Sequence, residues 1–135
     1  MDKIVPRAQQ GVIVTEDDST YYSVVTNIGR EKIAQALKTG TPLEIKEIAL
    51  GDANGSSVLP DRTATKLVHE VWRGSCVTTL DPSNPSTVLA KTNVPITVGG
   101  WMVYEIAVID KDGDIIIHAN APGWIKLAVV NGMSN

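Results

Sequence analysis

The stretch from Gly99 to Gly113 constrains the fold of this chain most, because it predicts a β-hairpin from local sequence alone. Asp112-Gly113 lies between two apolar runs, 102–109 and 115–119, and Asp-Gly is favoured in the two-residue turns that match strand twist. The two runs are therefore expected to pair as antiparallel strands. Apolar side chains occupy both alternating positions of the first run, so both of its faces are expected to be covered.

Glu105 is the exception in the first run, since it is a carboxylate among apolar residues. An unpaired carboxylate in such a strand would be costly, so the sequence predicts that Glu105 is buried and paired with Arg73 or, failing that, with Lys126. A structural ion pair is favoured over a catalytic acid. Replacing Glu105 with Gln is expected to cost about 1–3 kcal/mol of stability, because a buried cation would lose its partner.

Gly99 and Gly100 precede the hairpin and are expected to adopt backbone conformations closed to residues with a Cβ atom. This turn would place Trp101 at the start of the first strand as a packing anchor. A Gly100→Val substitution is therefore expected to impair folding.

Length and composition exclude several classes of protein. The chain has 135 residues, enough for one domain, and its net charge of -3 with scattered Lys and Arg gives no sequence-independent affinity for nucleic acid. Cys76 is alone, so one chain can form no disulfide or thiol metal site, which fits assembly in a reducing cytoplasm. No signal-peptide or membrane-spanning run appears, so neither secretion by a standard signal nor membrane insertion is predicted.

One helix is predicted over about residues 27–38. Thr26 supplies N-cap chemistry, Ile33 and Leu37 share a face at helical spacing, and Gly40 is placed to end the helix. From residue 43 onward the pattern favours strands, at 43–50, 66–73, 75–80, 87–92 and 96–98, before the hairpin. The predicted fold class is α+β, mainly antiparallel β: a compact β domain with one packed helix.

Residues 1–20 are predicted to form an extended N-terminal arm, separate from a body at residues 21–135. Their apolar residues are too few and too interrupted to form a core, so the arm is expected to become ordered only against a neighbour. The candidate partner-binding residues are Ile4, Val5, Val12, Ile13 and Val14.

Motifs for metal binding and catalysis are weak. Asp52-Ala-Asn-Gly55 and 110–114 resemble pieces of a calcium loop, but aligning either glycine with the sixth loop position leaves apolar residues where ligands belong, so turn chemistry is preferred. His69 and Cys76 could form a base and a nucleophile, but no third orienting group is identifiable. The sequence therefore predicts no cofactor, no metal and no enzyme.

The three tryptophans, Trp72, Trp101 and Trp124, are open to two interpretations. Their rings could form a sugar-stacking platform, or they could pack in the core or at an interface, which is the commoner use of Trp. A carbohydrate-binding β module using surface tryptophans is therefore retained as an alternative function.

A set of motifs occurs in order along the chain. It comprises Tyr21-Tyr22, Thr26-Asn27-x-Gly29, Lys32-Ile-Ala34, Ile48-Ala-Leu-Gly51-Asp52-x-Asn54-Gly55, Pro60, Glu70-Val71-x-Arg73, Pro95, Gly99-Gly100-Trp101, Glu105 through Asp110-x-Asp112-Gly113, Asn120-x-Pro122 and Lys126. Over about residues 21–126, the set resembles the N-terminal domain of phage tail-collar fibre proteins. By this resemblance, Gly51, Asp52, Gly55, Arg73, Gly99, Gly100, Trp101, Glu105, Asp112 and Gly113 are structural positions of the family motif.

The resemblance implies a non-catalytic virion structural protein, a module that attaches a tail fibre to the phage baseplate or tail for host adsorption. It implies a homotrimer continued by a distal fibre shaft, assembled in the bacterial host cytoplasm and located in the virion tail. Trp124-Ile-Lys-Leu stands where the family tends to read Tyr-Lys-Pro, and the sequence ends at Asn135 without a shaft. A whole fibre protein, a short adaptor and a fragment all remain open.

Overall fold

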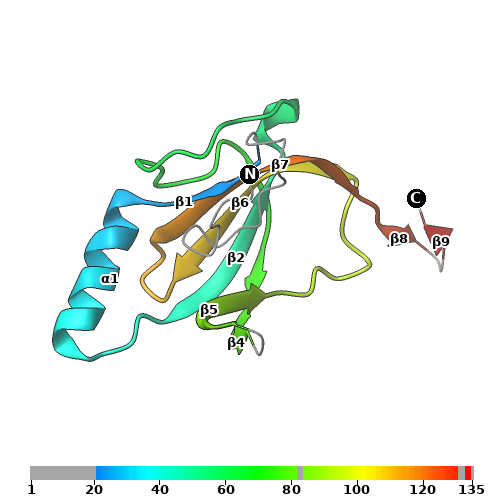
Figure 1. The fold of residues 1–135 in the computed structure, drawn as a ribbon. Coiled ribbons are helices and arrows are strands. Elements are labelled where there is room, and N and C mark those ends of the chain that lie inside the picture. Colours follow the sequence, from blue (N-terminus) through cyan, green and yellow to red (C-terminus); the bar gives the residue numbers. More distant parts are fainter. Residues whose placement is uncertain (1–20, 82–83, 131–132, 135) are drawn as a thin grey trace.

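The predicted hairpin lies in the middle of the fold. Strands β6 (Trp101–Asp110) and β7 (Ile115–Lys126) pair antiparallel, as expected. In the computed structural model, which describes residues 21–81, 84–130 and 133–134, they belong to a five-stranded sheet of order β1-β7-β6-β2-β3 (Figure 1). The remaining strands of this sheet are β1 (Ser23–Val25), β2 (Ile45–Gly51) and β3 (Glu70–Ser75), and all of its pairings are antiparallel.

The turn of the hairpin is longer than predicted. The Gly113 N–H donates to the Asp110 carbonyl at 3.0 Å, and the Asp110 N–H donates to the Asp114 carbonyl at 3.0 Å. The loop is therefore Lys111-Asp112-Gly113, a β-turn completed by Gly113 in the left-handed region at a φ of 88°. The prediction of a two-residue turn is wrong because the Asp110 side chain accepts the N–H groups of Asp112 and Asp114, which stabilises the wider loop.

One face of β6 is buried and the other is mostly half-buried. Along β6, Val103, Glu105, Ala107 and Ile109 are buried, and the side chains between them are half-buried. The core cluster joins three strands with a residue of the β2–β3 connection, and it consists of Ala49, Leu67, Ala107, Ile109 and Ile115. The expectation of two covered faces is therefore met fully on the face that carries Ala107, where Leu67 of the β2–β3 connection packs, and in part on the other face.

Helix α1 (Asn27–Thr39) has the predicted boundaries to within one residue. Thr26 is the N-cap and accepts the Gly29 N–H at 2.9 Å, while Gly40 ends the helix at a φ of 76°. The first turn contacts β7 closely, since a Cβ atom at Gly29 would lie 2.5 Å from the Ile116 carbonyl oxygen. The Thr26 hydroxyl also donates to the Ile115 carbonyl at 2.6 Å, so the cap fastens the helix to the hairpin.

Beyond its first turn, α1 packs less than its sequence suggests. Gly29 is its one buried residue, and the predicted packing face is open, with Ile33 37% and Leu37 82% exposed. The helix starts where β1 ends and continues past the edge of the sheet (Figure 1). An amphipathic pattern predicts which face is apolar, but it does not say whether the chain supplies a surface to cover that face.

Two short hairpins and a helical turn complete the described fold. Strands β4 (Val77–Asp81) and β5 (Asn84–Lys91) form one hairpin, and β8 (Val129–Val130) and β9 (Met133–Ser134) form the other. The 3-10 turn η2 (Ala53–Gly55) follows β2. The predicted strand at 96–98 is instead a turn, closed by the Val98 N–H donating to the Pro95 carbonyl. Within the described ranges no helix has the length and apolarity needed to cross a membrane.

Candidate functional site

Glu105 lies at the centre of a buried polar cluster. Its exposed fraction is 0%, Oε2 accepts the backbone N–H of His69 at 3.1 Å, and Oε1 lies 3.3 Å from Nε2 of His118. The Asp61 N–H donates to Nδ1 of His118 at 2.9 Å, so Nδ1 carries a lone pair and the ring proton sits on Nε2. His118 therefore donates to Glu105 as a neutral imidazole, and the carboxylate is held by two donors.

The burial of Glu105 is as predicted, but its predicted partners are wrong. Arg73 pairs on the surface with Glu70 at 2.8 Å and with Glu47 at 3.3 Å. Lys126 donates instead to the carbonyl oxygens of Val98 and Leu127, at 2.6 and 2.7 Å. The strand register explains the error, because the residues opposite Glu105 are Gly51 and Asn120, whereas Arg73 lies opposite Ala49.

Gly51, the last residue of β2, and Asp52, which follows it, shape the same cluster. A Cβ atom at Gly51 would lie 2.7 Å from Oε2 of Glu105 and 2.8 Å from the His69 carbonyl oxygen, so the carboxylate occupies space that only glycine leaves free. Asp52 Oδ1 lies 2.7 Å from Nδ1 of His69 and accepts the Asn54 N–H, and the hydrogen bond with His69 is the main reason that the pKa of Asp52 lies below its usual value. The turn ends at Gly55, whose φ is 94°, so turn chemistry accounts for this segment.

A second polar cluster joins α1 to the tip of the hairpin. Lys32 Nζ lies 2.6 Å from Asp110, 3.0 Å from Asp112 and 2.7 Å from Asp114. Hydrogen bonds to Asp110 and then to Asp114 raise the pKa of Lys32 above its ordinary value. Burial raises the pKa of Asp110, but the hydrogen bonds from Lys32 and from two backbone N–H groups outweigh burial and hold that pKa below its ordinary value.

The Lys32 contact predicts a pH-dependent difference in stability. The free energy of unfolding of an Asp110→Asn variant at pH 7 is expected to be about 1–3 kcal/mol lower than that of the wild type, because a buried charge-assisted hydrogen bond is weakened. The pKa of Asp110 is lowered from 3.8 in the folded chain, so its contribution is present above that value and is lost as pH falls through the folded pKa. Urea unfolding at several pH values should show the gap between wild type and variant shrinking below about pH 4.

Asp112→Asn is the matched control for that measurement. The Asp112 carboxylate contacts the same Nζ, but its side chain is 60% exposed. Its loss is expected to cost less than about 1 kcal/mol. Equal losses in the two variants would contradict the assigned role of Asp110.

Gly99 and Gly100 have backbone conformations that disfavour other residues, as predicted. Their φ angles are 155° and 90°, and the Gly100 N–H donates to the Lys126 carbonyl at 2.6 Å. A Cβ atom at Gly99 would lie 2.6 Å from the Leu127 carbonyl carbon. The turn brings the chain directly into β6, where Trp101 lies half-buried opposite Lys126.

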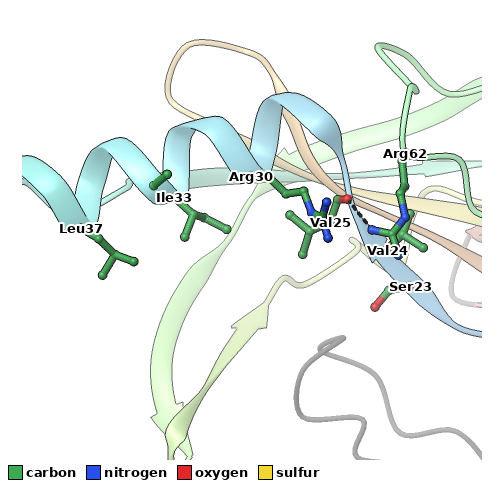
Figure 2. Close-up of a pocket in the computed structure, with 8 residues that line it drawn as sticks. Ser23, Val24, Val25, Arg30, Ile33, Leu37 and Arg62 are labelled. Atoms are coloured by element: carbon green, nitrogen blue, oxygen red, sulfur yellow. Dashed lines mark hydrogen bonds between the residues drawn. The ribbon is translucent and has the colours of Figure 1, made fainter.

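Two surfaces of the described chain remain open. The first, here called the α1–β1 groove, encloses about 340 Å³ between helix and strand, and Figure 2 shows side chains from both elements around it. The second, the C-terminal apolar strip, consists of Met102 and Ile125, which are exposed and lie opposite each other near the far end of the hairpin. Exposed apolar groups of this kind commonly mark interaction surfaces.

The comparisons with known proteins identify the family of this chain. A family model described as the N-terminal part of phage tail-collar fibre protein matches residues 18–135. The chain belongs to that family. A relative named as a probable tail fiber protein of Escherichia phage P2 is 32% identical over 114 residues. The alignment covers 83% of this tail-collar fibre chain but only 17% of the length of that relative. No solved structure matches the chain.

The three tryptophans of the tail-collar fibre domain differ in exposure. Trp124 is 58% exposed, whereas Trp72 and Trp101 are half-buried. The Trp72 ring lies against Gly74, in the space that a Cβ atom there would occupy. The exposed pair that would favour a carbohydrate-binding module is therefore not formed within the described residues.

The predicted alternative of a cysteine nucleophile also finds no support in the tail-collar fibre domain. Burial is the main reason that the pKa of the Cys76 thiol is raised, with Glu47 adding to it, whereas reactive thiols have lowered values. The ring of His69 is hydrogen-bonded to Asp52. Within the described residues the ring of His69 makes no hydrogen bond to the Cys76 thiol, so the two residues are not arranged as an activated pair.

Sequence reasoning missed the residues that satisfy the buried carboxylates. Lys32 was not assigned to Asp110, nor His118 to Glu105. A usable signal existed for His118, because in the pairing of β6 with β7 it lies opposite Ala107, on the same face as Glu105. The candidate partner-binding residues, Ile4, Val5, Val12, Ile13 and Val14, lie outside the described residues.

Proposed function

We propose that this domain is a non-catalytic module that attaches a tail fibre to the phage baseplate or tail for host adsorption. The observation that carries the proposal is the family match over residues 18–135, which is to the N-terminal part of tail-collar fibre proteins. The named tail fibre relative supports it, and so does the use of the buried ionisable groups as hydrogen-bonded supports of the sheet. In this proposal the protein is assembled in the host cytoplasm and resides in the virion tail.

The proposed contact with the tail is the N-terminal arm. Its apolar residues come in two short groups, Ile4-Val5 and Val12-Ile13-Val14, separated by polar residues and Pro6. Short apolar segments of this kind cannot form a core by themselves, but they can fill pockets of a partner and become ordered there. The partner in this proposal is a baseplate or tail protein.

The test uses the full chain and tail particles assembled without fibres. A variant carrying Ile4→Asp and Val5→Asp is expected to bind these particles about tenfold more weakly or worse, because two apolar contacts are replaced by charge. Leu59→Asp is the matched control, since Leu59 is 67% exposed on the body of the domain. Full-affinity binding by the double variant would rule out this part of the arm as the attachment segment.

We further propose that the domain assembles as a homotrimer, with the distal fibre shaft continuing the threefold axis. The C-terminal apolar strip supports this proposal, because Met102 and Ile125 are exposed, lie opposite each other in the β6–β7 pairing and need a covering surface. Sedimentation of a fibre chain that continues beyond Asn135 is expected to give a trimer, weakened by Ile125→Asp and not by Leu59→Asp. A strict monomer or dimer would contradict the proposed assembly.

A further inference from the structure

The α1–β1 groove has an apolar helical wall that the described chain leaves uncovered. Ile33, Ala34 and Leu37 line it from α1, and Val25 lines it from β1. Figure 2 shows Ile33 and Leu37 projecting from the same side of the helix. Exposure rises along this wall, from 37% at Ile33 to 82% at Leu37, so the open part lies toward the C-terminal end of α1.

Two arginines stand at the β1 end of the same groove. Arg30 lies one turn of α1 before Ile33, and Arg62 comes from the β2–β3 connection. Arg62 Nη1 donates to the Val25 carbonyl at 3.2 Å, and this contact fixes the guanidinium beside β1 (Figure 2). Within the part of the chain that the structure describes, neither guanidinium forms an ion pair with a carboxylate. The groove therefore suits an extended segment that is apolar at one end and acidic at the other.

The arm of the same chain has this pattern. Val12-Ile13-Val14 is followed, after Thr15, by Glu16-Asp17-Asp18. Asp18 is three residues before Tyr21, so an arm folded back at Tyr21 brings its acidic residues to the β1 end of the groove first. Val14 lies seven residue spacings before Tyr21, which an extended chain spans in about 23 Å, and Val12 lies nine spacings before it, about 30 Å. From Tyr21 the chain runs along β1 for up to about 20 Å to the start of α1, and Leu37 lies ten residues, about 15 Å, along that helix. Because α1 turns away from the line of β1 (Figure 1), the direct line from Tyr21 to Leu37 is shorter than this path, so Val12 can reach Leu37 and Val14 can reach Ile33.

We propose that, in the free chain, residues 12–18 fold back into the α1–β1 groove of the same molecule. The carboxylates of 16–18 pair with Arg30 and Arg62, and Val12-Ile13-Val14 covers Ile33 and Leu37. The short connection gives the arm a high effective concentration at its own groove, which favours it over a second copy. Ordering the arm costs conformational entropy, so the contact is reversible. For the free chain this replaces the expectation that the arm becomes ordered only against a neighbour, and it holds whether or not the arm also binds the tail.

Paramagnetic relaxation measured by NMR on the full 135-residue chain tests the proposal. Cys76→Ser removes the native thiol, and Thr15→Cys places a spin label between the apolar and the acidic residues. The amide signals of residues 33–37 are expected to lose intensity. A second sample mixes spin-labelled chains with isotope-labelled chains that carry no spin label, and there the same signals are expected to keep their intensity. Loss in the mixed sample would show that a second copy occupies the groove and would overturn the proposal.

Charge variants separate docking from chance proximity. The double variant Arg30→Glu with Arg62→Glu is expected to recover the amide signal intensity of residues 33–37, because the acidic arm is no longer attracted. Adding Asp17→Arg and Asp18→Arg to that variant restores opposite charges, so the same signals are expected to lose intensity again. Lys38→Glu is the matched control, because it reverses a cation on the same helix that does not line the groove. A dispersed amide spectrum verifies that each variant is folded. The proposal would be overturned if the spin label at position 15 caused no loss of signal intensity at residues 33–37. It would also be overturned if Lys38→Glu recovered that intensity as much as the arginine variants do.

Discussion

Glu105→Gln is expected to lower the free energy of unfolding by about 1–3 kcal/mol, although it changes one atom. Glu105 is fully buried, and each carboxylate oxygen accepts a hydrogen bond, one from the His69 N–H and one from Nε2 of His118. Glutamine offers one oxygen, so its NH₂ group must face a donor. One donor then stays buried without an acceptor. The expected loss of stability therefore comes from this unsatisfied donor, and not from a buried cation without a partner as the sequence suggested.

Urea unfolding monitored by circular dichroism measures this difference directly. Glu70→Gln is the control, because Glu70 is an exposed carboxylate that pairs with Arg73 at the surface. Its loss is expected to change the free energy of unfolding by less than about 1 kcal/mol. Equal free energies of unfolding for the two variants would show that the hydrogen bonds to Glu105 do not stabilise the sheet.

Gly99→Ala is expected to be the more damaging of two substitutions in the turn before β6, with a loss of about 3 kcal/mol or more. The backbone at Gly99 has a φ of 155°, and a Cβ atom there would lie 2.6 Å from the Leu127 carbonyl carbon and from the Lys126 carbonyl oxygen. Both contacts are with backbone, so no flexible side chain can move away. The segment after β7 would have to shift.

Gly100→Ala separates backbone strain from steric contact. Its φ is 90°, but a Cβ atom there would meet no atom within 4 Å. The expected loss is therefore the cost of the left-handed conformation alone, about 1–2 kcal/mol. Thermal unfolding should give a clearly lower melting temperature for Gly99→Ala than for Gly100→Ala. The reverse order would mean that the chain after Lys126 is not packed against this turn.

Local sequence was sufficient for the elements whose formation depends on residues close together in the chain. The hairpin follows from two apolar runs around Asp112-Gly113. The helix boundaries follow from Thr26, which satisfies an N–H of the first turn, and from Gly40, which reaches the left-handed conformation without strain. These interactions span a few residues, so they can be predicted before any tertiary contact is known. Family membership also followed, because ordered motifs are a property of the chain itself.

Contacts between distant segments were decided only by the tertiary structure. The hydrogen bonds to Glu105 come from His69 and His118, which meet through the register of separate strands and the path of the β2–β3 connection. A one-residue change in register would turn every side chain of a strand to the other face, and local sequence does not determine that register. The sequence alone therefore determined that Glu105 needs partners, while the packing of distant strands decided which groups they are and left one face of α1 open.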